Sequence, residues 1–353
     1  MRNLSIYFFL IAYLFYFRIS AQIDTDALFE DVPYESWGDE ETFFKSKKVD
    51  FLQIPSSISD SVKFAIVVYK PDRPSRVLLT SHGWHMSVRP PNGEKNPYPN
   101  FLTVQVDMRG RKYSTGKQDC NGYELYDFYD AYRYVVNTYE ALVQDPEQVY
   151  FAGGSGAGGN GLGLVGKFPD LFCSAVIRCG MSDYAAWYRQ DTSGEFRDEM
   201  LPWIGATPEQ NPEAYNSRSG IAMVENLITP LYISHGETDI RVPSSHSRNY
   251  VEKAKKMGKK VDYIELQGVG TRKHWGNIAP EQERLKAQQQ EKGLREHPTP
   301  KLKAKGELLV PGFVVTKHFS VFMDSIDHIG LITYNLPKSE IAFSKGKGKV
   351  VWH

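Results

Sequence analysis

The most informative stretch of the sequence places a serine among small residues, where a strand candidate runs into a helix candidate. Ser155 stands between Gly153 and Ala157, each two positions away, and Gly158 follows. Such a turn needs small neighbours because the strand and the helix pass close together, and it leaves the serine hydroxyl exposed. The amide of Gly156 lies at the helix start, where it can donate to a developing oxyanion. The stretch therefore predicts a nucleophilic serine with one half of an oxyanion hole.

Two further reactive residues follow in the order that this chemistry requires. A serine hydroxyl is a weak nucleophile and needs a neighbouring base, which is itself held by a third group. Asp239 lies on a loop after an apolar strand candidate, and His274 lies on a loop after the next one. The order serine, aspartate, histidine is the chain order of an α/β-hydrolase triad. All three residues follow the carboxyl ends of strand candidates, where open parallel sheets collect their reactive groups.

Two further segments supply a second candidate oxyanion donor and a rival for the triad acid. The Ser-His-Gly-Trp stretch follows an earlier strand candidate, so the amide of Gly83 or Trp84 can supply the second oxyanion donor. Asp183 is the main rival for the triad acid because it also follows a strand candidate. Asp239 is preferred, since its place between the penultimate core strand and His274 fits the order of the motif.

The glycines around the serine also spell a dinucleotide-binding fingerprint, with Gly154, Gly156 and Gly159. That motif normally opens the first βαβ unit and has an acidic residue about 20 positions on. Here several strand candidates precede it, and the nearest acidic candidate, Asp183, comes 29 positions after Gly154. We therefore expect no nucleotide cofactor.

Three histidines invite a metal-site interpretation: His82, His85 and His235. Their spacing is not that of a zinc site, and His82 and His235 begin the loops that carry the expected oxyanion donor and acid. We expect no metal ligand among them.

Strand and helix candidates alternate from residue 62 to residue 266. The strand candidates are rich in apolar, β-branched and aromatic residues and span 62–69, 76–81, 102–106, 148–152, 174–179, 230–234 and 261–266. A helix candidate at 123–142 carries aromatic residues at three- or four-residue steps, which we interpret as core packing. Asp127 and Asp130 on this helix are expected to be solvated or to cap it. The alternation predicts an α/β fold with a mainly parallel central sheet.

Other segments predict a cap, a polar helix and a small β-rich module beside the central sheet. Residues 182–226 hold aromatic and polar residues without a clean strand, as in a small cap inserted between two strands. The mixed charges from residue 281 to residue 305 predict a solvated face that begins with a polar helix at 281–293. The domain boundaries that we expect are a catalytic domain at 22–294, a linker at 295–306 and a small β-rich module at 307–353.

The segment from about residue 76 to residue 277 resembles the catalytic domain of the prolyl oligopeptidase branch (peptidase family S9) of the α/β-hydrolases. The resemblance rests on an Asp-Met-Arg-Gly run, a nearby Ser-Thr-Gly run, the serine elbow and the His-Gly-Glu-Thr-Asp run that ends at Asp239. It implies the α/β-hydrolase fold and a covalent acyl-enzyme. It also implies Ser155 as the nucleophile, His274 as general base and then acid, and Asp239 as the group that orients His274.

Two features differ from the large peptidases of this branch. Only residues 22 to about 61 precede the first core strand candidate, so we expect no N-terminal propeller. The tyrosine that donates to the oxyanion in some members is not evident in the Ser-His-Gly-Trp stretch. Compact exported relatives include carboxylic esterases that act on acylated polysaccharides. Candidate substrate contacts are aromatic residues that could stack on sugar rings or could simply pack the cap: Trp187, Tyr188, Trp203 and Trp275.

Composition narrows the class of protein. With 42 Lys+Arg against 42 Asp+Glu, the chain lacks the cationic surplus of a protein that binds nucleic acid through bulk charge. Hydrophobic residues make up 41% and charged residues 24%, which is enough apolar material for a large core. Three cysteines are an odd number, so the fold is not expected to depend on a disulfide framework.

The first 21 residues resemble a secretory signal. A short basic start precedes an apolar run at 4–17, and the small residue Ala21 precedes Gln22. A membrane anchor is the alternative, but spanning a bilayer takes ~20 apolar residues. We therefore expect an exported protein, periplasmic or secreted, without a membrane span after cleavage.

Together these observations predict an exported serine hydrolase. The first hypothesis is a carboxylic esterase that acts on acylated carbohydrate in polysaccharide degradation, with a small molecule or an oligosaccharide ester as substrate. One alternative is an S9-like serine peptidase that cleaves short peptides. Another is a non-catalytic carbohydrate-binding protein on the same fold. Nucleic acid is not expected as a partner.

Overall fold

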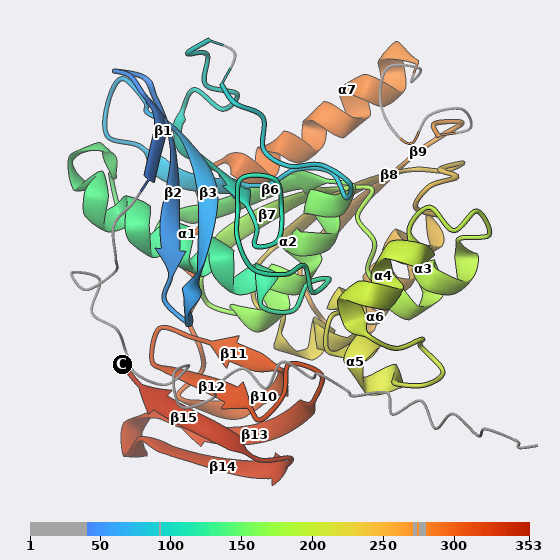
Figure 1. The fold of residues 1–353 in the computed structure, drawn as a ribbon. Coiled ribbons are helices and arrows are strands. Elements are labelled where there is room, and N and C mark those ends of the chain that lie inside the picture. Colours follow the sequence, from blue (N-terminus) through green and yellow to red (C-terminus); the bar gives the residue numbers. More distant parts are fainter. Residues whose placement is uncertain (1–40, 92, 271–273, 275–279) are drawn as a thin grey trace, which may run out of the picture.

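The structure of the protein, a computed structural model, describes residues 41–91, 93–270, 274 and 280–353. Within these residues one large sheet has the strand order β1-β2-β3-β5-β4-β6-β7-β8-β9 (Figure 1). Its strands are β1 (Glu41–Lys45), β2 (Val49–Ser56), β3 (Ser59–Tyr69), β4 (Arg76–Thr80), β5 (Phe101–Asp107), β6 (Val149–Gly154), β7 (Phe172–Arg178), β8 (Leu231–Gly236) and β9 (Val261–Leu266).

The sheet is antiparallel at one edge and parallel over the rest. β1, β2, β3 and β5 pair antiparallel in succession. β5, β4, β6, β7, β8 and β9 pair parallel in succession. The predicted α/β fold with a mainly parallel sheet is confirmed, and the carboxyl ends of the parallel strands meet at one edge.

All seven predicted strands occur, with ends that differ by at most three residues. The sequence does not predict β1 or β2. In β2 a charged residue and a proline, Asp50 and Pro55, interrupt the apolar run, yet most of the strand is buried. Asp50 accepts a hydrogen bond from Lys70 Nζ at 2.7 Å, which compensates for burying its carboxylate.

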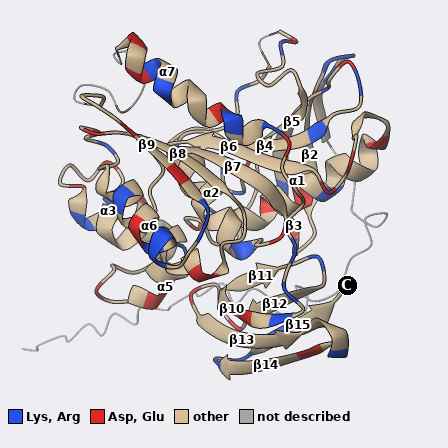
Figure 2. Ribbon diagram, turned by 180° about the vertical axis from the view of Figure 1, so that it is seen from behind, with Lys and Arg blue, Asp and Glu red and all other residues tan. Residues whose placement is uncertain are grey.

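Helices cover both faces of the sheet (Figure 1). One face carries α1 (Glu124–Thr138), followed by the short turn η3 (Glu140–Leu142), together with α2 (Gly156–Lys167) and α6 (Ser245–Lys256). The other face carries α7 (Glu281–Gln289) and η5 (Gln290–Leu294). α7 and η5 correspond to the predicted polar helix, and Figure 2 shows charges of both signs along α7.

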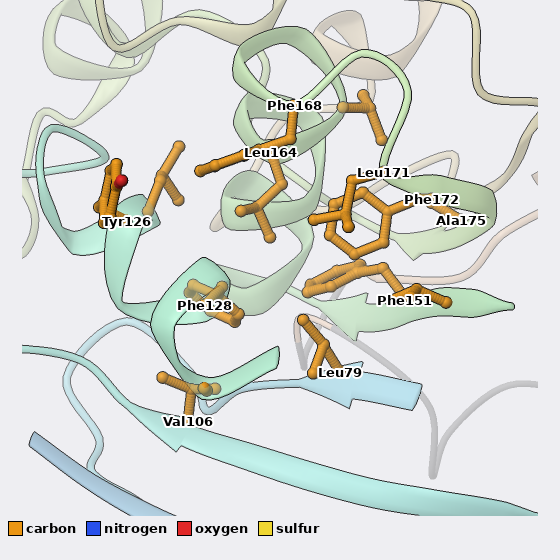
Figure 3. Packing of buried hydrophobic residues seen from close by; sticks show 14 of the residues in the cluster. Leu79, Val106, Tyr126, Phe128, Phe151, Leu164, Phe168, Leu171, Phe172 and Ala175 are labelled. Carbon is orange, nitrogen blue, oxygen red and sulfur yellow. The ribbon is translucent and has the colours of Figure 1, made fainter. Parts of the chain in front are cut away.

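The main core lies between α1, α2 and the sheet (Figure 3). Phe128 of α1 meets Phe151 of β6 edge to face, with ring centroids 6.0 Å apart. Tyr126 and Tyr129 contact Phe168, which directly follows α2, with ring centroids 6.3 and 5.4 Å apart. The aromatic stripe on α1 therefore packs in the core, as predicted.

Two acidic residues of α1 are buried, so the prediction that they are solvated or cap the helix is wrong. Asp127 accepts from the Arg109 amide at 2.8 Å and from its guanidinium Nη2 at 2.5 Å. Asp130 accepts from the hydroxyl and the amide of Ser57 at 2.6 and 2.8 Å. Burial raises the pKa of Asp130 to about 7, against the opposing hydrogen bonds from Ser57. These partners are distant in the chain, so the helical spacing alone does not reveal them.

Between β7 and β8 the chain leaves the sheet and forms a small helical layer, which we call the cap. It contains α3 (Tyr184–Gln190), α4 (Arg197–Ile204), α5 (Pro212–Asn216) and η4 (Gly220–Asn226). Trp187, Met200 and Tyr215 belong to a buried cluster that is separate from the main core. The cap lies beside the ends of β8 and β9 (Figure 1).

The last strands form two small antiparallel sheets, which we call the β module. The strands are β10 (Lys305–Pro311), β13 (Ile329–Asn335) and β14 (Glu340–Lys345) in one sheet, β11 (Phe313–Val315), β12 (Phe319–Met323) and β15 (Gly348–Trp352) in the other, with the turn η6 (Leu336–Lys338) between β13 and β14. Phe313 and Phe322 join the main core, and the Phe313 ring lies 5.4 Å from that of Tyr126. Lys167 of α2 is buried and donates to the Pro311 carbonyl. The β module is thus packed against the main core.

Two further findings concern the cysteines and the possibility of a membrane span. Cys120, Cys173 and Cys179 are all buried and free. Among the described residues, none of the helices combines the length and the hydropathy that a membrane span requires. The expected signal at 1–21 lies outside the described residues.

Candidate active site

Ser155 lies on the turn between β6 and α2 in a strained backbone conformation. Its φ of 57° and ψ of −122° fall in a region that residues other than glycine rarely adopt. The Ser155 amide donates to the carbonyl of Arg178 at 2.9 Å, and the Gly159 amide donates to the Ser155 carbonyl at 2.9 Å. These bonds hold the strand–serine–helix turn that the sequence predicts.

Glycines let the segments around this turn approach closely. A Cβ atom on Gly153 would lie 2.7 Å from a carbonyl oxygen of the helix that follows. One on Gly158 would lie 2.8 Å from the Cα atom of Gly180, and one on Gly159 would lie 2.3 Å from the sulfur of Met181. Close packing therefore accounts for Gly159, the last glycine of the pattern that resembles a dinucleotide fingerprint, whereas a Cβ atom on Gly154 would make only ordinary contacts.

Asp239 follows β8 and fixes the ring of His274. His274 Nδ1 lies 2.7 Å from Oδ2 of Asp239 and 2.9 Å from Oδ1. The carboxylate also accepts from the amides of Arg241 and Val242 at 2.9 and 3.0 Å. Burial raises the pKa of Asp239, but the hydrogen bonds from His235 and His274 outweigh burial and lower the pKa to about 2. The ionised carboxylate therefore occupies Nδ1 and leaves Nε2 for a reacting group.

In this structure Nε2 of His274 faces a residue that the sequence analysis does not select as reactive. It lies 3.6 Å from Sγ of Cys179, which directly follows β7 and is 1% exposed. Burial lowers the pKa of His274, but the hydrogen bonds with Asp239 and Cys179 outweigh burial and raise the pKa to about 10. In this arrangement His274 therefore carries a proton at neutral pH. Cys179 is the last residue of a predicted strand. Knowledge of the strand order would have placed it near the site, because β7 lies between β6, which leads to Ser155, and β8, which leads to Asp239.

The loop after β4 that holds Gly83 and Trp84, which we call the oxyanion loop, brings the other expected oxyanion donors to the start of α2. A Cβ atom on Gly156 would lie 2.5 Å from the amide nitrogen of Trp84 and 2.9 Å from the carbonyl carbon of Gly83. Arg111 holds this loop, because its Nη1 donates to the Trp84 carbonyl at 2.9 Å. Its guanidinium carbon also lies 4.9 Å from the ring centroid of Trp203 in the cap. Arg111 is not among the residues predicted from the sequence, although it directly follows the Asp-Met-Arg-Gly run.

Two glutamates attach the cap to the same loop. Trp84 Nε1 donates to Glu199 Oε2 at 2.6 Å. His85 contacts Glu199 through Nδ1 at 3.0 Å and Glu195 through Nε2 at 3.1 Å. Arg241, two residues after Asp239, also pairs with Glu195. The cap is thus tied to the oxyanion loop and to the loop that carries Asp239.

The structure does not bring His82, His85 and His235 together. His85 faces the cap glutamates, whereas His82 Nδ1 lies 2.9 Å from the carbonyl oxygen of Gly83. His235 Nδ1 lies 2.7 Å from the hydroxyl oxygen of Ser247. Burial lowers the pKa of His82 to about 4. Each histidine therefore has its own hydrogen-bond partners within the described part of the chain.

The aromatic residues expected to contact substrate differ in exposure. Trp187 is 1% exposed, and its ring stacks on that of Phe196 at 4.3 Å, so it cannot stack on a sugar ring in this arrangement. Its bulk instead forms the core of the cap. Tyr188 and Trp203 are partly exposed. Trp275 lies outside the described residues.

Asp183, the rival for the triad acid, has a different role. It is the N-cap of α3 and accepts a hydrogen bond from the Ala186 amide at 2.9 Å. Since Asp239 contacts His274 directly, the geometry favours Asp239 as the acid.

Comparison with known proteins agrees with this arrangement. Residues 99–291, more than half of the chain, match the model of the prolyl oligopeptidase family. An uncharacterized peptidase of Bacillus subtilis (strain 168), YtmA, is 30% identical over 168 residues, which cover 46% of this chain and 61% of that protein. The chain thus spans less than two thirds of the length of this curated relative.

Solved structures show the same fold. An acylaminoacyl peptidase of Pyrococcus horikoshii superposes with a TM-score of 0.59 and 21% identity, over 73% of this chain and 43% of that chain. Acetyl xylan esterase 1 from Thermoanaerobacterium sp. JW/SL YS485 superposes with a TM-score of 0.53 and 15% identity, over 71% of this chain and 87% of that chain. At these identities the superpositions establish the α/β-hydrolase fold alone.

Proposed function

Because the chain belongs to the prolyl oligopeptidase family, we propose that it is a serine hydrolase in which Ser155 attacks an acyl carbonyl. The observation that carries this proposal is the 2.7 Å contact between His274 and Asp239, at the same sheet edge as the strained Ser155. A serine, a histidine base and a carboxylate that orients the base are the groups that acyl transfer needs.

The proposed reaction proceeds through an acyl-enzyme. The hydroxyl proton of Ser155 moves to Nε2 of His274 while Oγ bonds to the carbonyl carbon. The amides of Gly156 and of Trp84 or Gly83 stabilise the resulting oxyanion. The bond to the leaving group then breaks, and His274 gives the proton to that group. A water molecule, deprotonated by His274, then attacks the acyl-enzyme in the same way, which releases the carboxylic acid and restores Ser155.

This reaction requires His274 to exchange one hydrogen-bond partner. A general base must be neutral, whereas the contacts with Cys179 and Asp239 keep His274 protonated. Replacing the contact with Cys179 Sγ by one with Ser155 Oγ removes one of the hydrogen bonds that favour the protonated ring. In our proposal this exchange accompanies substrate binding.

For the substrate, we propose a carboxylic ester with a small acyl group, carried by an acylated carbohydrate outside the cytoplasm. The ring of Trp84, whose amide is one of the proposed oxyanion donors, packs against the rings of Trp187 and Trp203, with centroids 4.8 and 4.9 Å away. These rings fill the cap side of the loop, which favours a short acyl chain. The partly exposed Tyr188 and Trp203 remain candidate sugar contacts. Export rests on the signal-like pattern at 1–21.

The nucleophile can be tested by covalent labelling. We expect a fluorophosphonate probe to label the purified protein and Ser155→Ala to abolish the labelling. Asp239→Asn and His274→Ala should lower kcat for p-nitrophenyl acetate by about 10³-fold or more, because these residues act as a unit. Labelling that persists in Ser155→Ala would overturn the assignment.

A peptidase is the second candidate, because the 30% identical relative is described as a peptidase. Turnover of aminoacyl nitroanilides without turnover of acetylated xylo-oligosaccharides would favour it over the esterase. A folded protein that turns over neither substrate and resists the probe would instead favour a non-catalytic carbohydrate-binding protein.

A further inference from the structure

Four neighbouring strands bring four side chains with reactive groups to one edge of the sheet. β6, β7, β8 and β9 lie side by side and lead to Ser155, Cys179, Asp239 and His274 in that order. The proposed hydrolysis uses three of these side chains and leaves Cys179 without a chemical role. The Cys179 amide donates to the Ser234 carbonyl at 2.8 Å, which fixes the backbone that carries the thiol.

The distance between the thiol and the imidazole suits a metal ion. Zinc binds thiolate sulfur at about 2.3 Å and imidazole nitrogen at about 2.0–2.1 Å in tetrahedral geometry, which places the two ligand atoms about 3.5 Å apart. Sγ of Cys179 and Nε2 of His274 are 3.6 Å apart. A single ion can therefore contact both atoms with little movement of either side chain.

Asp239 supplies the support that a metal-bound histidine normally has. In such sites the ring nitrogen that does not bind the metal commonly contacts a carboxylate, which fixes the ring and the tautomer. Here Asp239 lies 2.7 Å from Nδ1 of His274, so Nε2 points toward the thiol. Among the described residues, these three side chains form a group of possible ligand atoms within 4.8 Å of one another.

We propose that Cys179 and His274 form an inhibitory site for a zinc-class divalent cation, with Asp239 orienting His274. On binding, the thiol proton of Cys179 and the Nε2 proton of His274 both leave to solvent. A sulfur–metal bond replaces the S–H bond, and the freed Nε2 lone pair occupies a second position. Water completes the coordination, and no electrons are transferred. A metal-bound Nε2 cannot accept the Ser155 proton, so the ion blocks hydrolysis. This last consequence rests on the proposed function.

The experiment titrates the purified full chain with Zn²⁺ and with Co²⁺. For the wild type, zinc should suppress hydrolysis of p-nitrophenyl acetate and EDTA should restore it, while cobalt should produce a thiolate-to-metal charge-transfer band. Cys179→Ser should abolish the band and weaken zinc binding, measured by calorimetry, by more than about tenfold. The matched control is Cys173→Ser in β7, the strand that Cys179 follows; the Sγ atom of Cys173 lies 3.3 Å from the Glu147 carbonyl oxygen. This control should behave as the wild type does.

Further variants separate the metal site from the catalytic proposal. Ser155→Ala should have no turnover and should keep the cobalt band. If Cys179→Ser does not fold by circular dichroism, His274→Ala should weaken zinc binding to a similar extent. A wild type without the band, a band that persists in Cys179→Ser, or turnover that zinc leaves unchanged would each overturn the metal site. A wild type with the band and without turnover would support the site and refute the proposed hydrolysis.

Discussion

The sharpest test of the proposed oxyanion hole is a single methyl group on Gly156. Gly156 is the first residue of α2, and a Cβ atom there would lie 2.5 Å from the Trp84 amide nitrogen. Its φ is negative, so alanine would meet no backbone penalty and would ordinarily favour the helix. The atoms nearest to such a Cβ belong to the backbone of the loop at Gly83 and Trp84.

The size of the effect follows from this distance. Ordinary contact begins near 3.4 Å, so Gly156→Ala must move the loop away by about 0.9 Å. A displacement of that size removes an oxyanion donor from its position, and one donor is worth about 10²–10³ in kcat. Substrate binding should change less, because the donor acts on charge that develops in the transition state. We expect kcat for p-nitrophenyl acetate to fall by about 10²–10³-fold with KM within about threefold.

The matched control is the glycine on the other side of the serine. A Cβ atom on Gly154 would lie 3.4 Å from the Arg178 Cβ, which is an ordinary contact. Gly154→Ala should therefore keep kcat within about threefold of the wild type. Thermal melting should show that both variants are folded. If folded Gly156→Ala kept wild-type kcat, neither the loop at Trp84 nor the start of α2 could be the oxyanion hole.

Three further predictions concern stability. Trp187→Ala should lower the free energy of unfolding by about 3–5 kcal/mol in urea titrations, because Trp187 is buried in the core of the cap. Tyr188→Ala should lower it less, because the Tyr188 side chain is partly exposed. Burial raises the pKa of Asp130 from 3.8 to about 7. The free energy of unfolding of the wild type should therefore fall as pH rises from about 4 to about 7. Asp130→Asn should remove the contribution of Asp130 to this fall, as measured by urea midpoints at a series of pH values. Burial lowers the pKa of Lys167, so Lys167→Met should raise the thermal midpoint at pH 7, and the gain should shrink as pH approaches 10.5.

The parts of the fold that the sequence predicts are those with a regular local pattern. Apolar runs identify the parallel strands, because such strands are buried on both faces. β2 does not fit this pattern, since Asp50 and Pro55 interrupt its apolar run. The buried Asp50 carboxylate is stabilised by partners from other segments, Lys70 Nζ and the Tyr139 hydroxyl. The burial of Asp127 is equally hidden, because its partner Arg109 approaches from another segment of the chain.

In the candidate site too, the sequence predicts the residues that belong to a local motif and not those that depend on contacts between distant segments. Ser155, Asp239 and His274 can be selected because each follows a strand and because chain order limits the choice. Cys179 also follows a strand, but its relation to His274 requires the order of the strands in the sheet. Arg111 is harder still to find, since its contact with the Trp84 carbonyl depends on how two loops fold over one another.

These contacts suggest where substrate preference resides. The cap contacts the oxyanion loop directly, because Glu199 accepts a hydrogen bond from the Trp84 ring. It also contacts the loop through Arg111, whose guanidinium lies over the ring of Trp203. The same Arg111 holds the Trp84 carbonyl, so a movement of the cap would change the position of the neighbouring amide as well as the shape of the acyl site. Serine, histidine and aspartate are common to esterases and peptidases and therefore cannot distinguish the two classes. The cap and the oxyanion loop are coupled and border the acyl group, so in our proposal they set which carbonyl is attacked.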